Sequence, residues 1–219
     1  MLVTAGPSRE FLDPVRFLSN RSSGKMGYAV ARQALARGHA VTLVSGPVAL
    51  PPPPGADVTQ VTSAEDMLGA VRQRLAWCHA LVMVAAVADW RPAQRSASKL
   101  KKEGMPPVLA LERTPDILSC LAPQKGARCF VGFAAETDDF EKHARAKLAA
   151  KRLDMIVLND VGRSDAGFET DTNQVRFLAA DGRVSDLPLM SKDDVAARIV
   201  QWIEAHAAAG ADGPATQSP

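Results

Sequence analysis

Short apolar runs alternate with amphipathic stretches from Met1 to about Leu158. The runs are apolar at nearly every position, which is typical of strands buried on both faces of a parallel sheet. The stretches between them have the spacing of helices that cover a sheet. The pattern therefore predicts an α/β fold with a mostly parallel sheet between helices. The predicted strands are Leu2–Thr4, Ala40–Ser45, Ala80–Ala86, Phe130–Phe133 and Met155–Leu158.

Helix-start and helix-stop signals place four helices between these strands. A glycine allows the left-handed cap that ends the first helix, a serine with an aspartate three positions on can cap the second, and a proline suits the first position of the third. The predicted helices are Gly24–Arg37, ending at Gly38; one from Ser63, with Met67, Leu68, Val71 and Leu75 inward; one from Thr114, with Pro115 at its first position; and Asp139–Arg152.

The pattern changes after Leu158. Gln174–Leu178 and Val184–Leu187 flank an Asp181-Gly182 turn, which predicts a C-terminal antiparallel hairpin. A final helix is predicted from Ser191 to about Ala207, with Val195, Ile199, Trp202 and Ile203 buried. Residues 1–207 are then one domain, and 208–219, small and polar, are predicted to be a disordered tail.

Composition narrows the class of protein. The 219 residues are 47% hydrophobic and 23% charged, which argues against wholesale disorder and coiled coils. A net charge of +2 supplies no global field for nucleic acid, and no apolar run approaches the ~20 residues of a membrane span. Three cysteines without a CxxC pair predict no disulfide framework and favour the reducing cytoplasm. We therefore expect a cytoplasmic protein with neither nucleic acid nor membrane as partner.

Candidate chemistry follows the strands, because ligands of open parallel sheets bind beyond the strands' carboxyl ends. The first strand leads into a long polar loop that reaches Gly24 and Gly27 at a helix start. The dinucleotide fingerprint G-x-G-x-x-G is absent, and Met26 stands where a P-loop has its metal-binding Ser or Thr. Two interpretations remain: an anion site at the helix N-terminus, or a loop that only caps and packs.

Three further segments have both a functional and a plain interpretation. Asp89 follows small alanines and could hold a cation or a sugar hydroxyl, or cap a turn. The lysine run 99–102 is either a solvated face or a lid that neutralises charge during nucleotidyl transfer. Lys147 and Lys151 share a helix face near a strand's carboxyl end, where they are surface lysines or partners of a triphosphate.

The sequence contains no recognisable motif for several common kinds of catalytic or binding site. The four histidines, His39, His79, His143 and His206, show no metal-ligand spacing and are expected at the surface, so no metal ligand is identified. There is no G-x-S-x-G elbow of a serine hydrolase. The lysines are not interleaved with aromatic residues, as nucleic-acid motifs often are.

Taken together, the segments resemble the bacterial phosphopantothenate–cysteine ligase family, usually the carboxyl-terminal half of a bifunctional coenzyme A biosynthesis protein. The resemblance runs in order from Leu2 to about Ile203. Ser8, Trp90, Leu100 and Leu158 depart mildly from the family pattern, and none of these changes removes a charged group. The segments that carry it are 4–10, 13–16, 19–27, 85–92, 99–102, 114–118, 131–137 and 153–161.

The resemblance implies a Rossmann-like three-layer sandwich without a dinucleotide, and a reaction in two steps. The carboxylate of 4′-phosphopantothenate attacks the α-phosphate of CTP, with Mg²⁺ present, and leaves an acyl-cytidylate. The amine of L-cysteine then expels CMP and forms 4′-phosphopantothenoyl-L-cysteine. The chemical reason is that a carboxylate is a poor electrophile until its oxygen becomes a good leaving group.

The resemblance also implies roles for residues. Lys99 is associated with catalysis, and the Asn20 amide holds the acyl-cytidylate. The family forms dimers whose sites use both subunits, so we expect a homodimer, with the segment after Asp160 at its contacts, and in the natural context a fused flavin-dependent decarboxylase domain; no flavin is expected on this chain. Positions that match the family's CTP contacts are Asp89, Lys99, Pro115, Asp116, Ile117, Leu118, Phe133, Lys147 and Lys151, and those that match substrate contacts are Asn20, Ala85 and Ala86.

Two other functions remain as alternatives. An NAD(P)-dependent oxidoreductase could use the same fold, because fold alone does not determine function, although the missing glycine fingerprint argues against it. A non-catalytic nucleotide-binding module would bind CTP without turnover.

Overall fold

The computed structural model describes residues 1–102, 108–136, 140–160 and 170–211. Several predictions fall outside these ranges: the start of the fourth helix at Asp139, Thr137 of one family segment, most of the segment expected at dimer contacts, and positions 212–219 of the expected tail. No helix in the described part of the chain is long and apolar enough to cross a bilayer.

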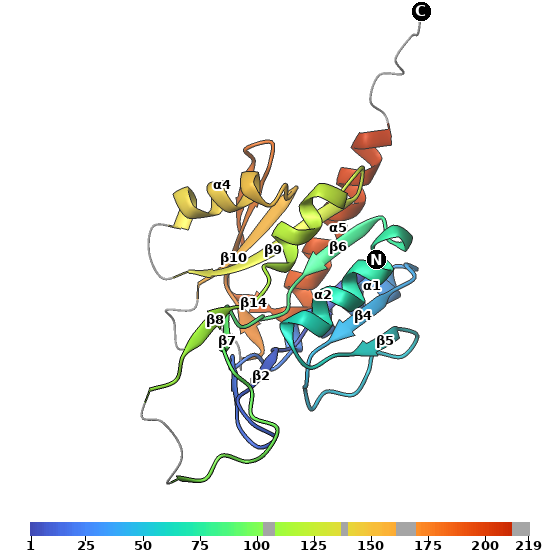
Figure 1. Cartoon of the computed structure of the whole chain (residues 1–219). Helices are drawn as coiled ribbons and strands as arrows, with labels where there is room; N and C mark the ends of the chain where they lie inside the picture. The colour runs from blue at the N-terminus through green and yellow to red at the C-terminus, as the bar shows by residue number, and fades with distance from the viewer. Residues whose placement is uncertain (103–107, 137–139, 161–169, 212–219) are drawn as a thin grey trace, which may run out of the picture.

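An eight-stranded sheet forms the centre of the molecule, in the order β13-β12-β10-β9-β6-β1-β4-β5 (Figure 1). The six strands from β10 to β5 in that order are parallel, and β12 runs antiparallel to both of its neighbours, β10 and β13. The fold class predicted from the sequence is therefore confirmed. The strands are β1 Leu2–Ala5, β4 Thr42–Ser45, β5 Asp57–Gln60, β6 Ala80–Met83, β9 Cys129–Glu136, β10 Met155–Asp160, β12 Val175–Ala179 and β13 Val184–Asp186.

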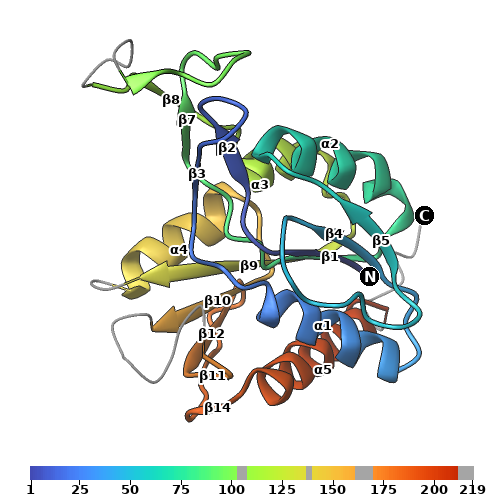
Figure 2. The same cartoon turned by 90° about the horizontal axis from the view of Figure 1, so that it is seen from below.

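Helices cover both faces of the sheet and complete three layers (Figure 2). On β1, Leu2 and Val3 are both fully buried and point to opposite faces, as successive strand residues must. Val3 packs in the core under α1 Lys25–Ala36 and α5 Lys192–Ala211. Leu2 packs in the core under α2 Ala64–Arg74, α3 Ile117–Leu121 and α4 Phe140–Ala150. Short 3₁₀ helices follow α2 and α3 at Leu75–Trp77 and Ala122–Gln124.

Two predicted boundaries near the carboxyl edge are wrong for a shared reason, since side chains there bind the backbone of a neighbouring loop. The strand predicted to reach Ala86 ends at Met83, because the Thr4 hydroxyl accepts the N–H groups of Val84 and Ala85, each at 3.1 Å. The third helix begins at Ile117 instead of Thr114. The Thr114 hydroxyl donates to the Ala88 carbonyl at 2.5 Å.

The start of α2 and the C-terminal region agree more closely with the prediction from the sequence. The Ser63–Asp66 capping box is present, and the predicted hairpin is confirmed as β12–β13, which extends the main sheet. α5 continues to Ala211, past the predicted end at Ala207. Trp202, predicted to be buried, is only partly buried. Its ring stacks on that of His206, with centroids 4.9 Å apart.

Short hairpins outside the main sheet have no counterpart in the sequence prediction. β2 Arg9–Phe11 pairs with β3 Phe17–Ser19, β7 Trp90–Pro92 pairs with β8 Leu111–Arg113, and β11 Thr172–Asn173 pairs with β14 Met190–Ser191. We call the described residues between 90 and 113 the arm; it extends away from the sheet beside β2 (Figure 1).

A buried carboxylate joins the β2–β3 hairpin to the arm. The Asp13 side chain is fully buried and accepts hydrogen bonds from Arg16 Nη2 at 2.5 Å and from the Leu100 N–H at 3.1 Å. Arg16 Nη2 also donates to the Leu100 carbonyl at 2.8 Å. The side-chain hydrogen bond from Arg16 is the main cause that holds the pKa of Asp13 well below its usual range. This cluster fixes the position of the arm next to Lys99.

Candidate functional site

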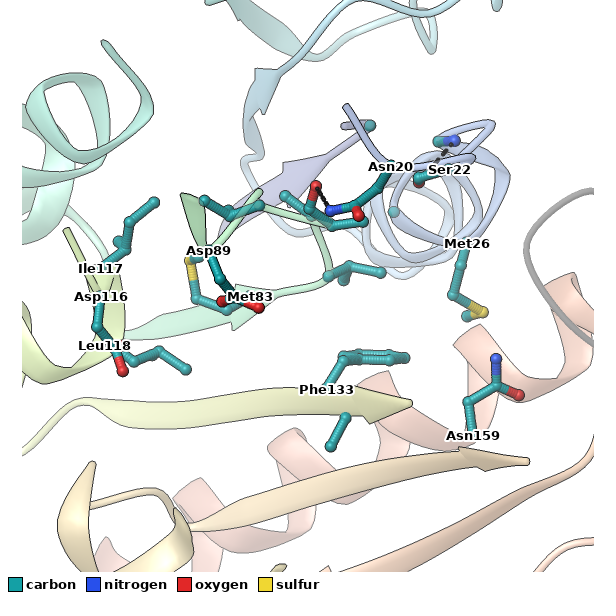
Figure 3. Close-up of a pocket in the computed structure, with 18 of the residues that line it drawn as sticks. Asn20, Ser22, Met26, Met83, Asp89, Asp116, Ile117, Leu118, Phe133 and Asn159 are labelled. Atoms are coloured by element: carbon teal, nitrogen blue, oxygen red, sulfur yellow. Dashed lines mark hydrogen bonds between the residues drawn. The ribbon is translucent and has the colours of Figure 1, made fainter. Parts of the chain in front are cut away.

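A cavity of about 610 Å³ opens at the carboxyl ends of the central strands. Figure 3 shows Asp89, Asp116 and Leu118 on one side, Met26 and Asn159 on the other, and Phe133 between them. Most of the site residues expected from the sequence line this one cavity, and Lys99 does not. Those that line it are Asn20, Ala85, Ala86, Asp89, Pro115, Asp116, Ile117, Leu118, Phe133, Lys147 and Lys151.

The loops that follow β1 and β6 brace each other at the cavity wall. The Ala86 N–H donates to the Gly6 carbonyl at 3.0 Å, and the Ala88 N–H donates to the Ser8 hydroxyl at 3.0 Å. Asn20 Nδ2 then donates to the Ala86 carbonyl at 2.9 Å. The carboxamide of Asn20 is thereby held at the cavity beside the two alanines that the sequence singled out.

The start of α1 lies against β1 without intervening side chains. Gly24, the N-cap residue, has φ of 79°, a conformation that residues with a Cβ rarely adopt. A Cβ on Gly27 would lie 2.6 Å from Ala5 Cβ and 2.7 Å from the Thr4 carbonyl oxygen. The glycines therefore serve packing, as the plain interpretation held. They also leave the first residues of α1 at the cavity wall, where a helix N-terminus favours an anion.

On the opposite wall, two lysines and the start of α3 come together. Lys151 Nζ lies 2.9 Å from Asp116 Oδ2, and the other Asp116 oxygen accepts the Ser119 N–H at 3.1 Å as the N-cap of α3. Burial raises the pKa of Asp116, but the hydrogen bonds from Lys151 and Ser119 outweigh it, so the net shift of this pKa is downward. Lys147 lines the cavity beside this pair.

Among the cavity residues that the sequence analysis did not assign to the site, those with an amide or ammonium group are Lys25, Asn159, Asn173 and Lys192. Asn159 stands at the carboxyl end of β10, so the rule that selected Asp89 could also have found it. Asn173 and Lys192 come from β11 and the start of α5, which reach the cavity only through the tertiary fold. No local pattern marks them.

Lys99 is exposed on the arm, away from the cavity lining of its own chain. Its neighbour Leu100 is held by Asp13 and Arg16, so the lysine belongs to a braced segment. Within one chain, Lys99 therefore lies apart from the cavity that contains the other residues assigned to CTP by the family resemblance.

At the opposite edge of the sheet, the structure gathers three groups that the sequence analysis did not connect. Ligand atoms of Cys129, Asp154 and His206 lie within 4.8 Å of one another. Lys125 Nζ already lies 2.7 Å from Asp154 Oδ1, and burial raises the pKa of the Cys129 thiol to about 12. A protonated thiol beside a lysine–aspartate pair is poorly suited to a metal. The predicted surface position holds for exposed His79, whereas His39 and His206 are partly buried.

Comparison with known proteins identifies close relatives. Residues 1–207 match the family described as DNA/pantothenate metabolism flavoprotein C-terminal domain. The chain is 48% identical over 206 residues to the coenzyme A biosynthesis bifunctional protein CoaBC of Bacillus subtilis, covering 94% of this chain and 51% of that protein. The chain thus spans about half the length of the curated relatives it matches.

Solved structures give the same result. The crystal structure of the C-terminal domain of CoaBC is 46% identical, with a TM-score of 0.81, and the match covers 94% of this chain and 96% of that one. The DNA/pantothenate metabolism flavoprotein of Streptococcus pneumoniae is 25% identical, with a TM-score of 0.80, covering 94% and 98% of the two chains. The alternative of an NAD(P)-dependent oxidoreductase finds no support in these matches.

Proposed function

The chain belongs to the family of the DNA/pantothenate metabolism flavoprotein C-terminal domain, and on that premise we propose that it is a ligase that joins 4′-phosphopantothenate to L-cysteine. The reaction cleaves CTP to CMP and pyrophosphate and passes through an acyl-cytidylate. One observation carries this proposal. A single cavity gathers residues from segments far apart in the chain: Asn20, Asp89, Phe133, Lys147 and Lys151. A role in coenzyme A biosynthesis fits the name that the relatives carry.

In the first step, a carboxylate oxygen of 4′-phosphopantothenate bonds to the α-phosphorus of CTP, and the bond from that phosphorus to the bridging oxygen breaks to release pyrophosphate. The approach of two anions requires positive charge around them. Lys147, Lys151 and the N-terminus of α1 supply it from opposite walls of the cavity.

In the second step, the amine nitrogen of cysteine bonds to the acyl carbon. The carbon–oxygen bond to the cytidylate breaks, CMP leaves, and the surplus amine proton passes to solvent. The hydrogen bond between Asn20 Nδ2 and the Ala86 carbonyl fixes the Asn20 carboxamide, which we assign to holding the intermediate for this attack.

The proposal includes Mg²⁺ bound with the nucleotide. Mg²⁺ is usually held by one or two carboxylates together with substrate phosphates. Asp89 is exposed at the cavity and has a carboxylate to offer, whereas the Asp116 carboxylate is engaged by Lys151. Asp89 therefore fits as the protein ligand, and the bound ion would neutralise charge on the triphosphate.

We further propose a homodimer in which the partner's Lys99 reaches the nucleotide. Support comes from the apolar side chains on the arm and the β2–β3 hairpin. Trp90, Leu111 and Val108 are 46%, 44% and 76% exposed, and Phe17 beside them is 41% exposed. Exposed apolar groups of this kind often mark protein interfaces. A dimer formed through the arm would cover these side chains. It would also place Lys99 of each subunit beside the cavity of the other subunit.

The relatives carry the word bifunctional in their name and are about twice the length of this chain. Fusion to a flavin-dependent decarboxylase domain therefore remains part of the proposal for the natural context. A cytoplasmic location stays a prediction from the cysteine pattern.

The decisive experiment incubates the protein with 4′-phosphopantothenate, L-cysteine, Mg²⁺ and either CTP or ATP, and identifies the products by mass. We expect 4′-phosphopantothenoyl-L-cysteine, CMP and pyrophosphate, with CTP preferred. CTP binding without turnover would indicate the non-catalytic module instead, and saturable NADPH binding without CTP turnover would favour the oxidoreductase.

The role of Asn20 predicts a separation of the two steps. Asn20→Asp should still release pyrophosphate from CTP and 4′-phosphopantothenate, but form the cysteine product at least ~10-fold more slowly, since a new negative charge weakens the hold on the intermediate. Parallel assays of pyrophosphate and of product measure this. Normal product formation by the variant would contradict the assignment.

A further inference from the structure

The loop that follows β6 stays attached to the β1 side of the cavity through two hydroxyl groups. Regular pairing of β1 with β6 stops at Thr4. Beyond that point the Thr4 hydroxyl accepts the first two N–H groups of the loop, and the Ser8 hydroxyl accepts the Ala88 N–H at 3.0 Å. Side-chain oxygens thus replace backbone carbonyls as acceptors along this stretch.

Ser8 is fully buried, and it is not among the residues that line the cavity. The end of β6 does not require its hydroxyl, because Thr4 binds the N–H groups there. Ala88 is itself only 8% exposed, so removal of the Ser8 hydroxyl would leave a buried backbone donor without this acceptor. A donor left in that state is costly, and the loop would have to shift to satisfy it.

Backbone atoms of Ser8 also join this loop to the segment that precedes Asn20. The Ser8 N–H donates to the Ala86 carbonyl at 3.3 Å. The Ser8 carbonyl accepts the Ser19 hydroxyl at 2.7 Å. Ser8 therefore contacts both the loop after β6 and the strand that leads into Asn20.

The Asn20 carboxamide depends on the same loop for its orientation. Asn20 is exposed, and its side chain makes one hydrogen bond within the described part of the chain, from Nδ2 to the Ala86 carbonyl at 2.9 Å. Figure 3 shows this bond as a dashed line at the cavity. An exposed side chain has several staggered rotamers available. The position of the Ala86 carbonyl therefore decides where the amide points.

We propose that Ser8 is a positioning residue for the second step of the reaction, because its hydroxyl holds the turn 86–88 and thereby keeps the Asn20 carboxamide directed at the acyl-cytidylate. This inference rests on the proposed ligase function and adds a residue outside the cavity that acts on one step. The positive charge for the first step comes from Lys147 and Lys151 on the opposite wall, so that step should be less sensitive to Ser8.

The first test separates the two steps in Ser8→Ala. Pyrophosphate release in a first turnover without L-cysteine should stay within about 2-fold of the unmodified protein, whereas formation of the cysteine product should fall about 10-fold, because a misplaced group lowers the rate of the step that it serves. KM for CTP should not change. Rapid-quench assays of pyrophosphate and of product measure both steps.

Ser45→Ala is the matched control. It also removes a fully buried hydroxyl, which donates to the Gly46 carbonyl at 2.9 Å, and neither residue lines the cavity. Both variants should lower the melting temperature by a similar ~2–4 °C, since each loses one buried hydrogen bond. Only Ser8→Ala should slow product formation.

A double-mutant cycle with Asn20→Asp tests whether Ser8 acts through Asn20. Asn20→Asp has no amide to donate to the Ala86 carbonyl, so the loop no longer directs this side chain. Adding Ser8→Ala should then slow product formation by less than about 2-fold further, whereas independent effects would multiply to about 100-fold in total. Ser8→Thr, which keeps a hydroxyl, should recover at least about half of the unmodified rate.

Other outcomes would overturn the proposal. Equal slowing of pyrophosphate release and product formation in Ser8→Ala, an unchanged product rate, or effects that multiply in the cycle would each leave Ser8 as a packing residue. If Ser8→Ala does not fold, Ser8→Cys takes its place in the same assays, because a thiol is a weak acceptor in a side chain of similar shape. Failure of the ligase proposal appears separately, since the unmodified protein would then release no pyrophosphate from CTP and 4′-phosphopantothenate.

Discussion

The cavity and the arm hold their functional residues in different ways. Cavity residues such as Ile117 and Asn159 stand on a helix and a strand whose inward-facing apolar side chains are buried. The packing of the three layers therefore fixes their positions. Lys99 stands on an exposed segment. This segment is held at Leu100 by the Asp13–Arg16 pair and at Ser96 by a hydrogen bond from its N–H to the Leu12 carbonyl. Substitutions in the sheet and its covering helices should therefore change stability first, and substitutions in the arm should change turnover first.

Lys99→Ala gives the largest expected effect and addresses the arm. We expect turnover to fall at least ~100-fold, as removal of an electrostatic stabiliser of the transition state often does. The melting temperature should stay unchanged because the side chain is exposed. Steady-state kinetics and thermal unfolding measure both, with Arg183→Ala in the β12–β13 turn as control. Near-normal turnover would contradict the role of Lys99.

Gly27→Ala tests the packing of helix α1 against strand β1 of the central sheet. The new Cβ would lie 2.6 Å from Ala5 Cβ, so α1 must move away from β1. We expect the free energy of unfolding to fall by ~1–3 kcal/mol. Gly69→Ala in α2, where a Cβ meets nothing within 4 Å, should instead gain up to ~1 kcal/mol. Equal effects of the two changes in urea unfolding would show that the contact between α1 and β1 is not tight.

Asp13→Asn tests whether the arm depends on its buried anchor. The amide keeps the size of the side chain but loses the ion pair with Arg16, which also holds Leu100. We expect turnover to fall ~10-fold through misplacement of Lys99, with KM for L-cysteine unchanged. Asp181→Asn, which removes an exposed pair with Arg183, should leave turnover intact. If Asp13→Asn is equally active, other contacts of the arm, such as the hydrogen bond from the Ser96 N–H to the Leu12 carbonyl at 2.9 Å, are sufficient to hold it.

The smallest effect concerns pH and the contact between α1 and α5. Arg37 and His39 lower the pKa of Glu204 from 4.5 to about 2 through hydrogen bonds. A lowered carboxyl pKa contributes stability above pH 4.5 that is lost as pH falls toward 2. Because the Glu204 side chain is 30% exposed and solvent screens the pair, we expect ~1 kcal/mol. Glu204→Gln should remove this part of the pH dependence and leave turnover at pH 7 unchanged.

The same difference explains what the sequence could predict. Central strands such as β1 and β6 are buried on both faces, so apolar runs reveal them directly. The hairpins β2–β3 and β7–β8 are short and exposed in part, and their pairing depends on contacts such as Asp13 with Leu100 that no local pattern contains. Thr114 similarly has a helix-start signal, but its hydroxyl is used by Ala88.

For the site, the rule that ligands bind beyond strand ends selected Ala85 and Asp89, which line one cavity. Phe133, in the same cavity, was assigned through the family resemblance. The rule could not locate Lys192, whose signal is only an unfavourable charge at a helix start. In the proposed homodimer Lys99 would act at the partner's cavity, and the sequence of one chain indicates this only through the family resemblance.

The outermost strands of the main sheet, β5 and β13, restrict how copies of the protein can associate. Both are short, and each carries an aspartate, Asp57 and Asp186, that forms an ion pair with a neighbouring arginine. Short, charged borders of this kind discourage strand addition and uncontrolled aggregation. Association through the sheet's backbone hydrogen bonds is thereby disfavoured. The proposed homodimer would instead use the exposed apolar side chains around Trp90, which favours a closed pair of subunits over an open fibre.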